Sequence, residues 1–186
     1  NTVFNYIKES YVDVYEEAFA LALKMGCAEI FGIPIDHFFE EDKKETPNPY
    51  WGISPRKIAQ FVGTELFRDT IAKLVPGIDS NFWLRRLESK LTGQTNSDTD
   101  GEYVPGDIVV ITDVRFQNEY DWIIKNGGWM LFLERDEAPE QVGIANHASE
   151  AGIPNLWMPQ RTWKILNNHS LEVLYEYVDL FIVATG

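Results

Sequence analysis

The sequence predicts one α/β domain in which an open parallel sheet is flanked by helices. Its 186 residues match the size of a single domain, and 45% of them are hydrophobic, which is enough for a buried core. Residues 108–111 form a continuous β-branched run, typical of a strand buried on both faces of a parallel sheet. Strand-like and helix-like segments alternate after this run, as they do in βαβ units.

Hydrophobic spacing and chain breakers define the elements of the first part of the chain. An apolar stripe at helical spacing predicts a helix at the N-terminus. A second helical pattern ends at Gly32, which Pro34 follows closely. The predicted elements are a helix over residues 3–11, a short strand over 12–15, a helix over 19–31 and an exposed loop over 40–50.

A helix start is marked by Ser54 and Pro55, because serine caps helices well and proline suits the first helical position. A polar linker over residues 94–106 precedes the most convincing strand. The elements predicted beyond Ser54 are helices over 54–66, 79–91, 118–125 and 170–182, strands over 108–111, 129–133 and 163–166, and a loop over 135–155.

The charge balance and the single cysteine exclude several classes of protein. Sixteen Lys and Arg against 29 Asp and Glu give a formal net charge of −13, which opposes non-specific binding to nucleic acid or anionic membranes. Cys27 alone cannot form an intramolecular disulfide, and no apolar run approaches the ~20 residues of a membrane span. We therefore expect a cytoplasmic protein without a nucleic-acid or membrane partner.

The strongest candidate site follows the run at residues 108–111. Asp113 and Arg115 lie where this strand ends, and ligands bind outside the carboxyl ends of strands in open α/β sheets. Asp113 suits the holding of hydrated Mg²⁺ near phosphates, and the fork of donors on Arg115 suits a phosphate. The structural alternatives are a helix cap for Asp113 and a surface ion pair between Arg115 and Glu119.

A second candidate site lies on the helix that begins after Ser54. Arg56, Gln60 and Gly63 share one helix face, at positions i, i+4 and i+7, next to the apolar stripe. A glycine inside a helix costs ~1 kcal/mol relative to alanine, which the close approach of a ligand or a neighbouring helix would explain. The alternative is a solvated helix edge.

The remaining candidates are single residues and one short motif. Lys24 is by itself a lysine at the edge of an apolar helix, and Trp83 could stack on a base or simply pack. His147 and Glu150 lie at i and i+3, where metal binding is a weak hypothesis and a helix start is the alternative. His169 shows no partner pattern and is interpreted as a surface or cap residue.

Taken together, four segments resemble in order the deoxynucleoside monophosphate kinases of tailed phages, a branch of the P-loop nucleotide-kinase fold. Residues 19–24, FALALK, look like the family's FAxPLK element. Residues 54–65 look like its S-x-R-x-x-x-Q-x-x-G-T-E/D helix, and Trp83 like the tryptophan after it. Residues 110–119 are similar to V-x-x-D-x-R-x-x-x-E, and residues 147–150 to H-x-S/T-E.

This resemblance implies transfer of the γ-phosphoryl group of ATP to a deoxynucleoside monophosphate, with Mg²⁺. Arg115, Arg135 and Asp113 would act in catalysis, Asp113 by holding the metal through water. The residues that the resemblance assigns to the acceptor nucleotide are Lys24, Arg56, Gln60, Trp83, Arg115 and Glu119. Those that it assigns to ATP are Asn1, Thr2, Arg135, His147 and Glu150.

The resemblance also implies one kinase-like domain over residues 1–186, with a helical acceptor-binding region over about 32–95 and a lid over about 135–150. The family begins with a strand and a G-x-x-x-x-G-K phosphate loop, which is absent from these residues, so we expect both to precede Asn1 in the complete protein. A homodimer and, for a phage-encoded protein, the host cytoplasm are compatible with the family. The alternatives are a catalytically silent binding protein on a kinase scaffold, or a P-loop kinase for another small molecule.

Overall fold

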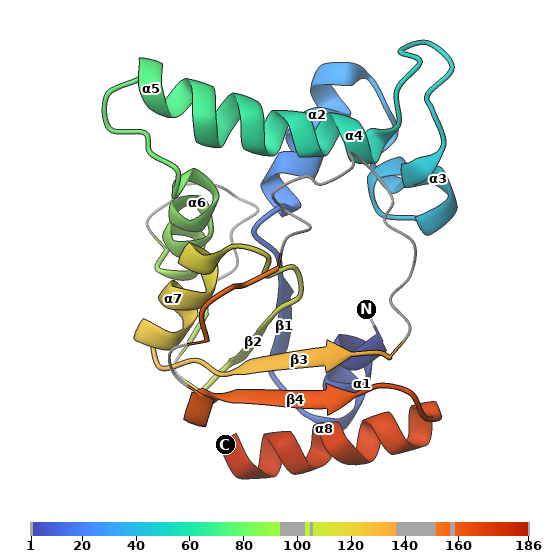
Figure 1. Cartoon of the computed structure of the whole chain (residues 1–186), viewed down its shortest axis with the longest axis vertical. Coiled ribbons are helices and arrows are strands. Elements are labelled where there is room, and N and C mark those ends of the chain that lie inside the picture. Colours follow the sequence, from blue (N-terminus) through green and yellow to red (C-terminus); the bar gives the residue numbers. More distant parts are fainter. Residues whose placement is uncertain (1, 94–102, 105, 137–151, 157–158, 186) are drawn as a thin grey trace. The chain divides into compact units, whose positions relative to one another are not determined.

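The computed structural model describes residues 2–93, 103–104, 106–136, 152–156 and 159–185 (Figure 1). The chain divides into two compact units, where the sequence predicts one domain. The α/β unit comprises Asn1–Glu16, Gly106–Glu140 and Ile153–Gly186, and the helical unit comprises Glu17–Pro105 and Gln141–Gly152. The predicted acceptor-binding region therefore lies within the helical unit.

The α/β unit contains the strands and helices that the sequence predicts there, with ends shifted by a few residues at most. Its described elements are α1 (Thr2–Ser10), β1 (Val14–Glu17), β2 (Ile108–Ile111), α7 (Gln117–Lys125), β3 (Met130–Glu134), the 3₁₀ turn η4 (Pro159–Arg161), β4 (Thr162–Leu166) and α8 (Leu171–Thr185). Parallel strands and flanking helices make this an α/β fold, as predicted.

The pairing of the strands differs from the single open sheet that the sequence predicts. In the described residues, β1 pairs with β2 and β3 pairs with β4, which gives two separate two-stranded sheets. The β3–β4 pair is parallel, with a register that runs from Met130 opposite Thr162 to Glu134 opposite Leu166. Every residue of β2 is half-buried rather than fully buried. Hydrophobic runs identify strands, but the pairing of strands depends on contacts between distant segments, which a run does not encode.

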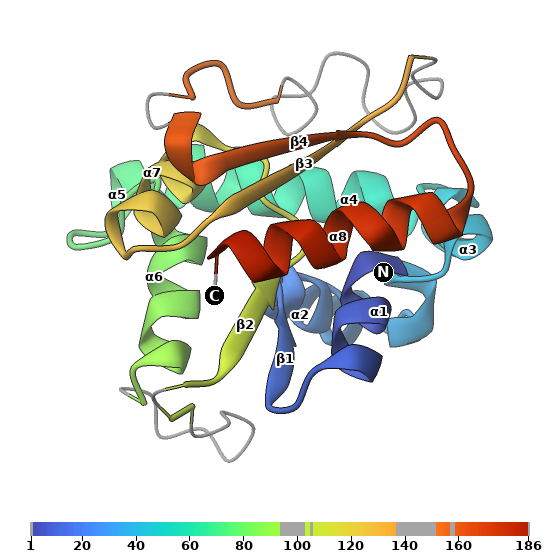
Figure 2. The same cartoon turned by 90° about the horizontal axis from the view of Figure 1, so that it is seen from below.

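The core of the α/β unit joins both sheets through α1 and α8. Figure 2 shows α8 beside β4 and α1, in agreement with their contacts. Tyr6 of α1 stacks on Tyr175 of α8 with 4.1 Å between ring centroids, and its hydroxyl donates to Asp179 at 2.8 Å. The buried side chains of this cluster come from both sheets and both helices: Val3, Phe4, Ile7, Val14, Ile165, Leu174 and Val178.

The helical unit contains helical segments that the sequence does not predict, at residues 35–38, 41–45 and 67–74. Its described elements are α2 (Leu21–Phe31), the 3₁₀ turn η1 (Ile35–Phe38), α3 (Glu41–Glu45), α4 (Pro55–Phe61), the π-helix η2 (Val62–Ile71), α5 (Ala72–Leu74) and α6 (Phe82–Leu91). The expectation of an exposed loop over residues 40–50 is wrong for its first half, because α3 forms there. Ion pairs at i, i+3 spacing join Lys43 to Glu40 and Lys44 to Glu41, and such pairs stabilise a helical turn.

The predicted helix start at Ser54 is confirmed. The Ser54 hydroxyl accepts from the backbone N–H of Lys57 at 3.4 Å, and Pro55 occupies the first helical position. Figure 1 shows α4, η2 and α5 as one continuous helix. No helix in the described part of the chain combines the length and the apolar character that a bilayer crossing requires.

Candidate functional site

The loop after β2 presents one exposed arginine on a fixed backbone. Glu119, on the first turn of α7, is 1% exposed, and its Oε2 accepts from the backbone N–H groups of Arg115 at 2.9 Å and Phe116 at 3.0 Å. The Arg115 side chain itself is exposed, while Asp113 is half-buried. The carboxylate of Glu119 therefore holds the loop from which Arg115 projects.

The helix-cap alternative for Asp113 is wrong, because the residue that caps α7 is Phe116. Asp113 thus stays within the loop that leaves β2, where the sequence predicts it. Gln117, the first residue of α7, makes two hydrogen bonds with the backbone of Asn155. Its Nε2 donates to the Asn155 carbonyl and its Oε1 accepts from the Asn155 N–H, both at 2.9 Å. This exchange ties the start of α7 to the segment before η4.

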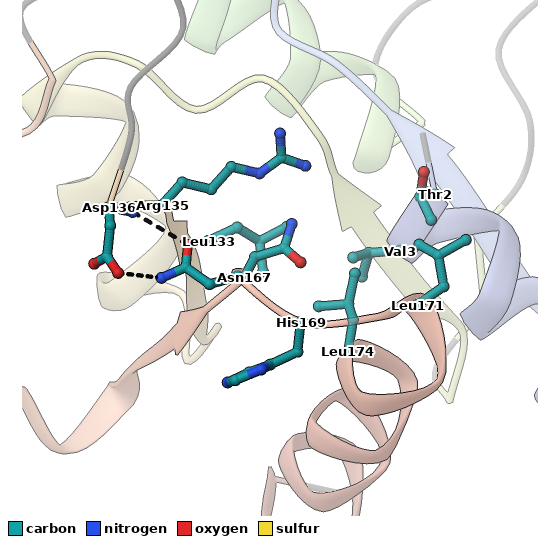
Figure 3. Close-up of a pocket in the computed structure, with 10 residues that line it drawn as sticks. Thr2, Val3, Leu133, Arg135, Asp136, Asn167, His169, Leu171 and Leu174 are labelled. Atoms are coloured by element: carbon teal, nitrogen blue, oxygen red, sulfur yellow. Dashed lines mark hydrogen bonds between the residues drawn. The ribbon is translucent and has the colours of Figure 1, made fainter.

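A cavity of about 710 Å³ opens beside the ends of β3 and β4, in the α/β unit (Figure 3). Two of the residues predicted to bind ATP, Thr2 and Arg135, line this one cavity. The remaining lining residues come from α1, β3, α8 and the chain after β4: Val3, Leu133, Asp136, Asn167, Asn168, His169, Leu171 and Leu174. The cavity combines a cation and several amide groups with an apolar wall, as nucleotide-sized pockets commonly do.

Asn167 and Asn168 line the cavity, although the sequence does not single them out. His169 is exposed, as predicted, and it lines the same cavity. A signal was present, because these polar residues directly follow β4 at its carboxyl end, the same location that singles out Asp113 after β2. Of the other residues predicted at ATP, Asn1, His147 and Glu150 lie outside the described residues.

The helical unit holds the other predicted acceptor residues. Arg56 donates to Glu45 of α3, with 3.2 Å between Nη1 and Oε1, and its side chain is only 16% exposed. Gln60 is 9% exposed, so the solvated-edge alternative for this helix face is wrong. On α2, the Lys24 ammonium lies 4.5 Å from the centre of the Phe39 ring. This helix face is thus turned toward the rest of the helical unit.

A neighbouring helix explains the glycine on this face. A Cβ atom on Gly63 would lie 2.6 Å from Cδ2 of Leu23 on α2. The carbonyl of Gly63 accepts from the indole N–H of Trp83 at 2.9 Å, and Trp83 is 6% exposed. Packing is therefore what the structure shows for Trp83, which contacts the ring of Phe67, and its contact with a nucleoside stays a prediction.

A model of the deoxynucleotide monophosphate kinase family matches residues 2–178. The chain belongs to this family. The predicted resemblance is thereby confirmed, and the matched residues span both compact units.

Two relatives in this family come from viruses. A putative deoxynucleotide monophosphate kinase of Acanthamoeba polyphaga mimivirus is 33% identical over 177 residues, which cover 88% of this chain and 80% of that protein. The deoxynucleoside-5'-monophosphate kinase of Escherichia phage T5 is 32% identical over 135 residues, 69% of this chain. The chain spans about half, 47%, of the phage protein's length.

Proposed function

We propose that the protein transfers the γ-phosphoryl group of ATP to a deoxynucleoside monophosphate and releases the diphosphate and ADP. The observation that carries this proposal is the family match over residues 2–178, supported by relatives that bear the names of such kinases. The fold that we infer is the P-loop nucleotide-kinase fold, in agreement with the α/β elements of the described chain.

We assign the donor nucleotide to the cavity beside β3 and β4. Thr2 and Arg135 both line this cavity, and both are predicted ATP contacts. The Arg135 guanidinium would neutralise charge on the transferred group, since phosphoryl transfer depends mainly on positioning and on charge neutralisation. Asn1, His147 and Glu150 remain predicted contacts of ATP.

We assign the acceptor nucleotide to Arg115 and to the helical unit. The exposed Arg115 would bind the acceptor phosphate through its fork of donors, with Arg56 and Lys24 adding positive charge. Gln60 and Trp83 would lie at the nucleoside. For Glu119, whose carboxylate already accepts two backbone hydrogen bonds, we propose that the effect on substrate passes through the loop that it holds.

The reaction then needs little covalent chemistry from the protein. A phosphate oxygen of the monophosphate attacks the γ-phosphorus, a new P–O bond forms, and the bond to the bridging oxygen of the departing ADP breaks. Arg115 would orient the attacking phosphate. Arg135 would stabilise the negative charge that is shared among the oxygens of the transferred group.

The described residues fit a magnesium ion held mainly by nucleotide phosphates. They contain no group of three or more His, Cys, Asp or Glu residues that could enclose a metal. Mg²⁺ often keeps several waters and binds through one or two carboxylates together with phosphates. Asp113, at the end of β2, would supply such a carboxylate through water. The ion would neutralise phosphate charge when bound.

Substrate screening tests the proposal. The full-length protein is incubated with ATP, Mg²⁺ and each of the four common deoxynucleoside monophosphates, and nucleotides are separated by chromatography. We expect at least one diphosphate to accumulate with a matching amount of ADP. Phosphorylation of free nucleosides instead would favour a different small-molecule kinase, and nucleotide binding without any turnover would favour a silent binding protein.

Other expectations from the family stay proposals with their own measurements. The lid predicted over about 135–150, of which the structure describes only residues 135 and 136, should exchange backbone hydrogens more slowly when ATP and the monophosphate are both present. Equal exchange with and without nucleotides would contradict a closing segment. A homodimer, action in the host cytoplasm and the absence of nucleic-acid and membrane partners likewise stay predictions.

A further inference from the structure

The chains that leave β3 and β4 are joined beyond the end of the sheet. The backbone N–H of Asn167 donates to the carbonyl of Glu134 at 2.7 Å, which continues the strand pairing by one residue. Asn168, the next residue, then binds Asp136 twice. Its Oδ1 accepts from the Asp136 backbone N–H at 3.2 Å, and its Nδ2 donates to Asp136 Oδ2 at 2.5 Å (Figure 3).

Arg135 lies between these two attachment points, Glu134 and Asp136. Its backbone is therefore held on both sides, and Figure 3 shows its side chain extending away from the Asp136 carboxylate. Holding a backbone on both sides of a side chain reduces the freedom that a ligand contact must otherwise remove.

Both acidic neighbours of Arg135 are engaged by other groups. Lys164 pairs with the Glu134 carboxylate at 2.7 Å, and Asn168 binds the Asp136 carboxylate. Within the residues that the structure describes, the Arg135 guanidinium makes no hydrogen bond or ion pair. A carboxylate next to a guanidinium competes with a phosphate for the same donors, because both anions bind that fork of N–H groups.

We propose that Asn168 is a positioning residue for phosphoryl transfer, acting through Arg135. Its side-chain amide fixes the backbone that carries Arg135 and keeps the Asp136 carboxylate away from the guanidinium. This inference rests on the proposed function, in which Arg135 binds the transferred phosphoryl group. It gives a role to an asparagine whose only recognisable signal in the sequence is its place after a strand.

A double-mutant cycle in the full-length protein tests this role. If Arg135→Ala lowers kcat by ~10²-fold, we expect Asn168→Ala to lower kcat by ~10-fold and to leave KM for the monophosphate within about twofold. In the Arg135→Ala background, Asn168→Ala should cause almost no further loss, because its effect passes through the missing guanidinium. A further ~10-fold loss in that background would overturn the proposal.

A variant that removes the Asp136 charge distinguishes a positioning role of Asn168 from a merely structural one. Asp136→Asn, added to Asn168→Ala, should recover part of the lost kcat, since the competing charge is gone; no recovery would overturn the idea that Asn168 restrains this carboxylate. Asn168→Asp keeps the size of the side chain and replaces Asn168→Ala in this test if the alanine variant does not fold. It should also lower kcat, because the donor to the Asp136 carboxylate is replaced by a like charge.

Two controls separate this inference from the function on which it rests. Asn126→Ala removes an exposed amide that donates to the Trp122 carbonyl at 2.8 Å, and should leave kcat unchanged. Wild-type protein that makes no diphosphate from any monophosphate would refute the proposed function. Active wild-type protein with an active Arg135→Ala variant would refute the role of Arg135, and with it the role of Asn168, while leaving the kinase function intact.

Discussion

At the scale of the residue, Glu119 fixes the backbone of the loop after β2, while the Arg115 side chain on that loop is exposed. Its buried carboxylate accepts from two consecutive backbone N–H groups, and the side chain of the first of these residues, Arg115, stays exposed. The same sequence pattern, an arginine followed four residues later by a glutamate, suggests an ion pair when it is considered alone. In the structure, the Glu119 carboxylate accepts from the backbone N–H groups of Arg115 and Phe116 and is buried.

Removal of the Arg115 side chain should lower activity without unfolding the protein. Because Arg115 is assigned to the acceptor phosphate, Arg115→Ala should lower kcat/KM for the monophosphate by ~10²-fold, through the loss of a bidentate charged contact. Steady-state kinetics of the full-length protein measure this effect. Lys125→Ala, at an exposed cation on the other end of α7, is the matched control and should retain wild-type kinetics. Wild-type kinetics in Arg115→Ala would refute the assignment.

Removal of the Glu119 carboxylate should mainly lower the free energy of unfolding. Glu119→Ala leaves two backbone N–H groups without their acceptor and should lower the free energy of unfolding by about 2 kcal/mol or more. Glu119→Gln keeps one acceptor oxygen and should lower it by about half as much. Urea unfolding gives both values, with Glu176→Ala, an exposed glutamate of α8, as the control. Equal stability of Glu119→Ala and this control would contradict the backbone role.

At the scale of the element, close packing of α2 against the helix that begins at Ser54 explains a glycine that is costly by propensity alone. From the sequence, the close approach of a ligand or of a neighbouring helix would explain Gly63. The structure places Leu23 of α2 where a Cβ would lie, so the neighbouring helix is the explanation that it supports. The π-helical winding of η2 begins just before this contact, at Val62.

This packing predicts coupling between Gly63 and Leu23. Gly63→Ala should be less tolerated in the wild type than in a Leu23→Ala background, with a coupling of about 1–2 kcal/mol, because truncation of leucine makes room for the added methyl group. Urea unfolding of the four proteins in the cycle measures this coupling.

Gly26→Ala is the control, since a Cβ at Gly26 of α2 would meet nothing within 4 Å. That variant should be neutral or more stable by up to about 1 kcal/mol. Additive effects of Gly63→Ala and Leu23→Ala would contradict the contact.

The short helix α3 shows the limit of reasoning from composition at this scale. Residues 40–50 are charged and then proline-rich, and this composition is typical of a loop. Their charges are spaced so that lysines and acidic side chains meet one helical turn apart, and Lys43 also bonds to Asp36 of η1. The Asp36 side chain accepts from this lysine, which holds the pKa of Asp36 below its ordinary value.

At the scale of the whole molecule, the single cysteine links global stability to alkaline pH. Burial raises the pKa of the Cys27 thiol to about 11, from an ordinary value near 9. Between these values the unfolded chain loses the thiol proton while the folded protein keeps it, so the unfolded state binds fewer protons and stability falls as pH rises.

The pH dependence can be measured against a variant without the thiol. From pH 9 to pH 11, the free energy of unfolding of the wild type should fall by up to about 2 kcal/mol more than that of Cys27→Ala. Urea unfolding at intervals of half a pH unit, in the presence of a reductant, gives the two curves. The comparison uses only their slopes, because the alanine variant also leaves a cavity that is independent of pH. Parallel curves would show that the buried thiol does not control this range.

The sequence by itself determined the α/β class, the position of nearly every strand and helix, and the membership of the family. Hydrophobic periodicity and chain breakers act locally. The local sequence alone therefore predicts the helix start at Ser54 and the strand over residues 108–111. Only the tertiary structure decided which strands pair, that Trp83 packs against Gly63 and Phe67, and that Asn167, Asn168 and His169 share a cavity with Thr2 and Arg135. The physical reason is that strand pairing, burial and the walls of a cavity arise from contacts between segments far apart in the chain, and no local pattern specifies such contacts.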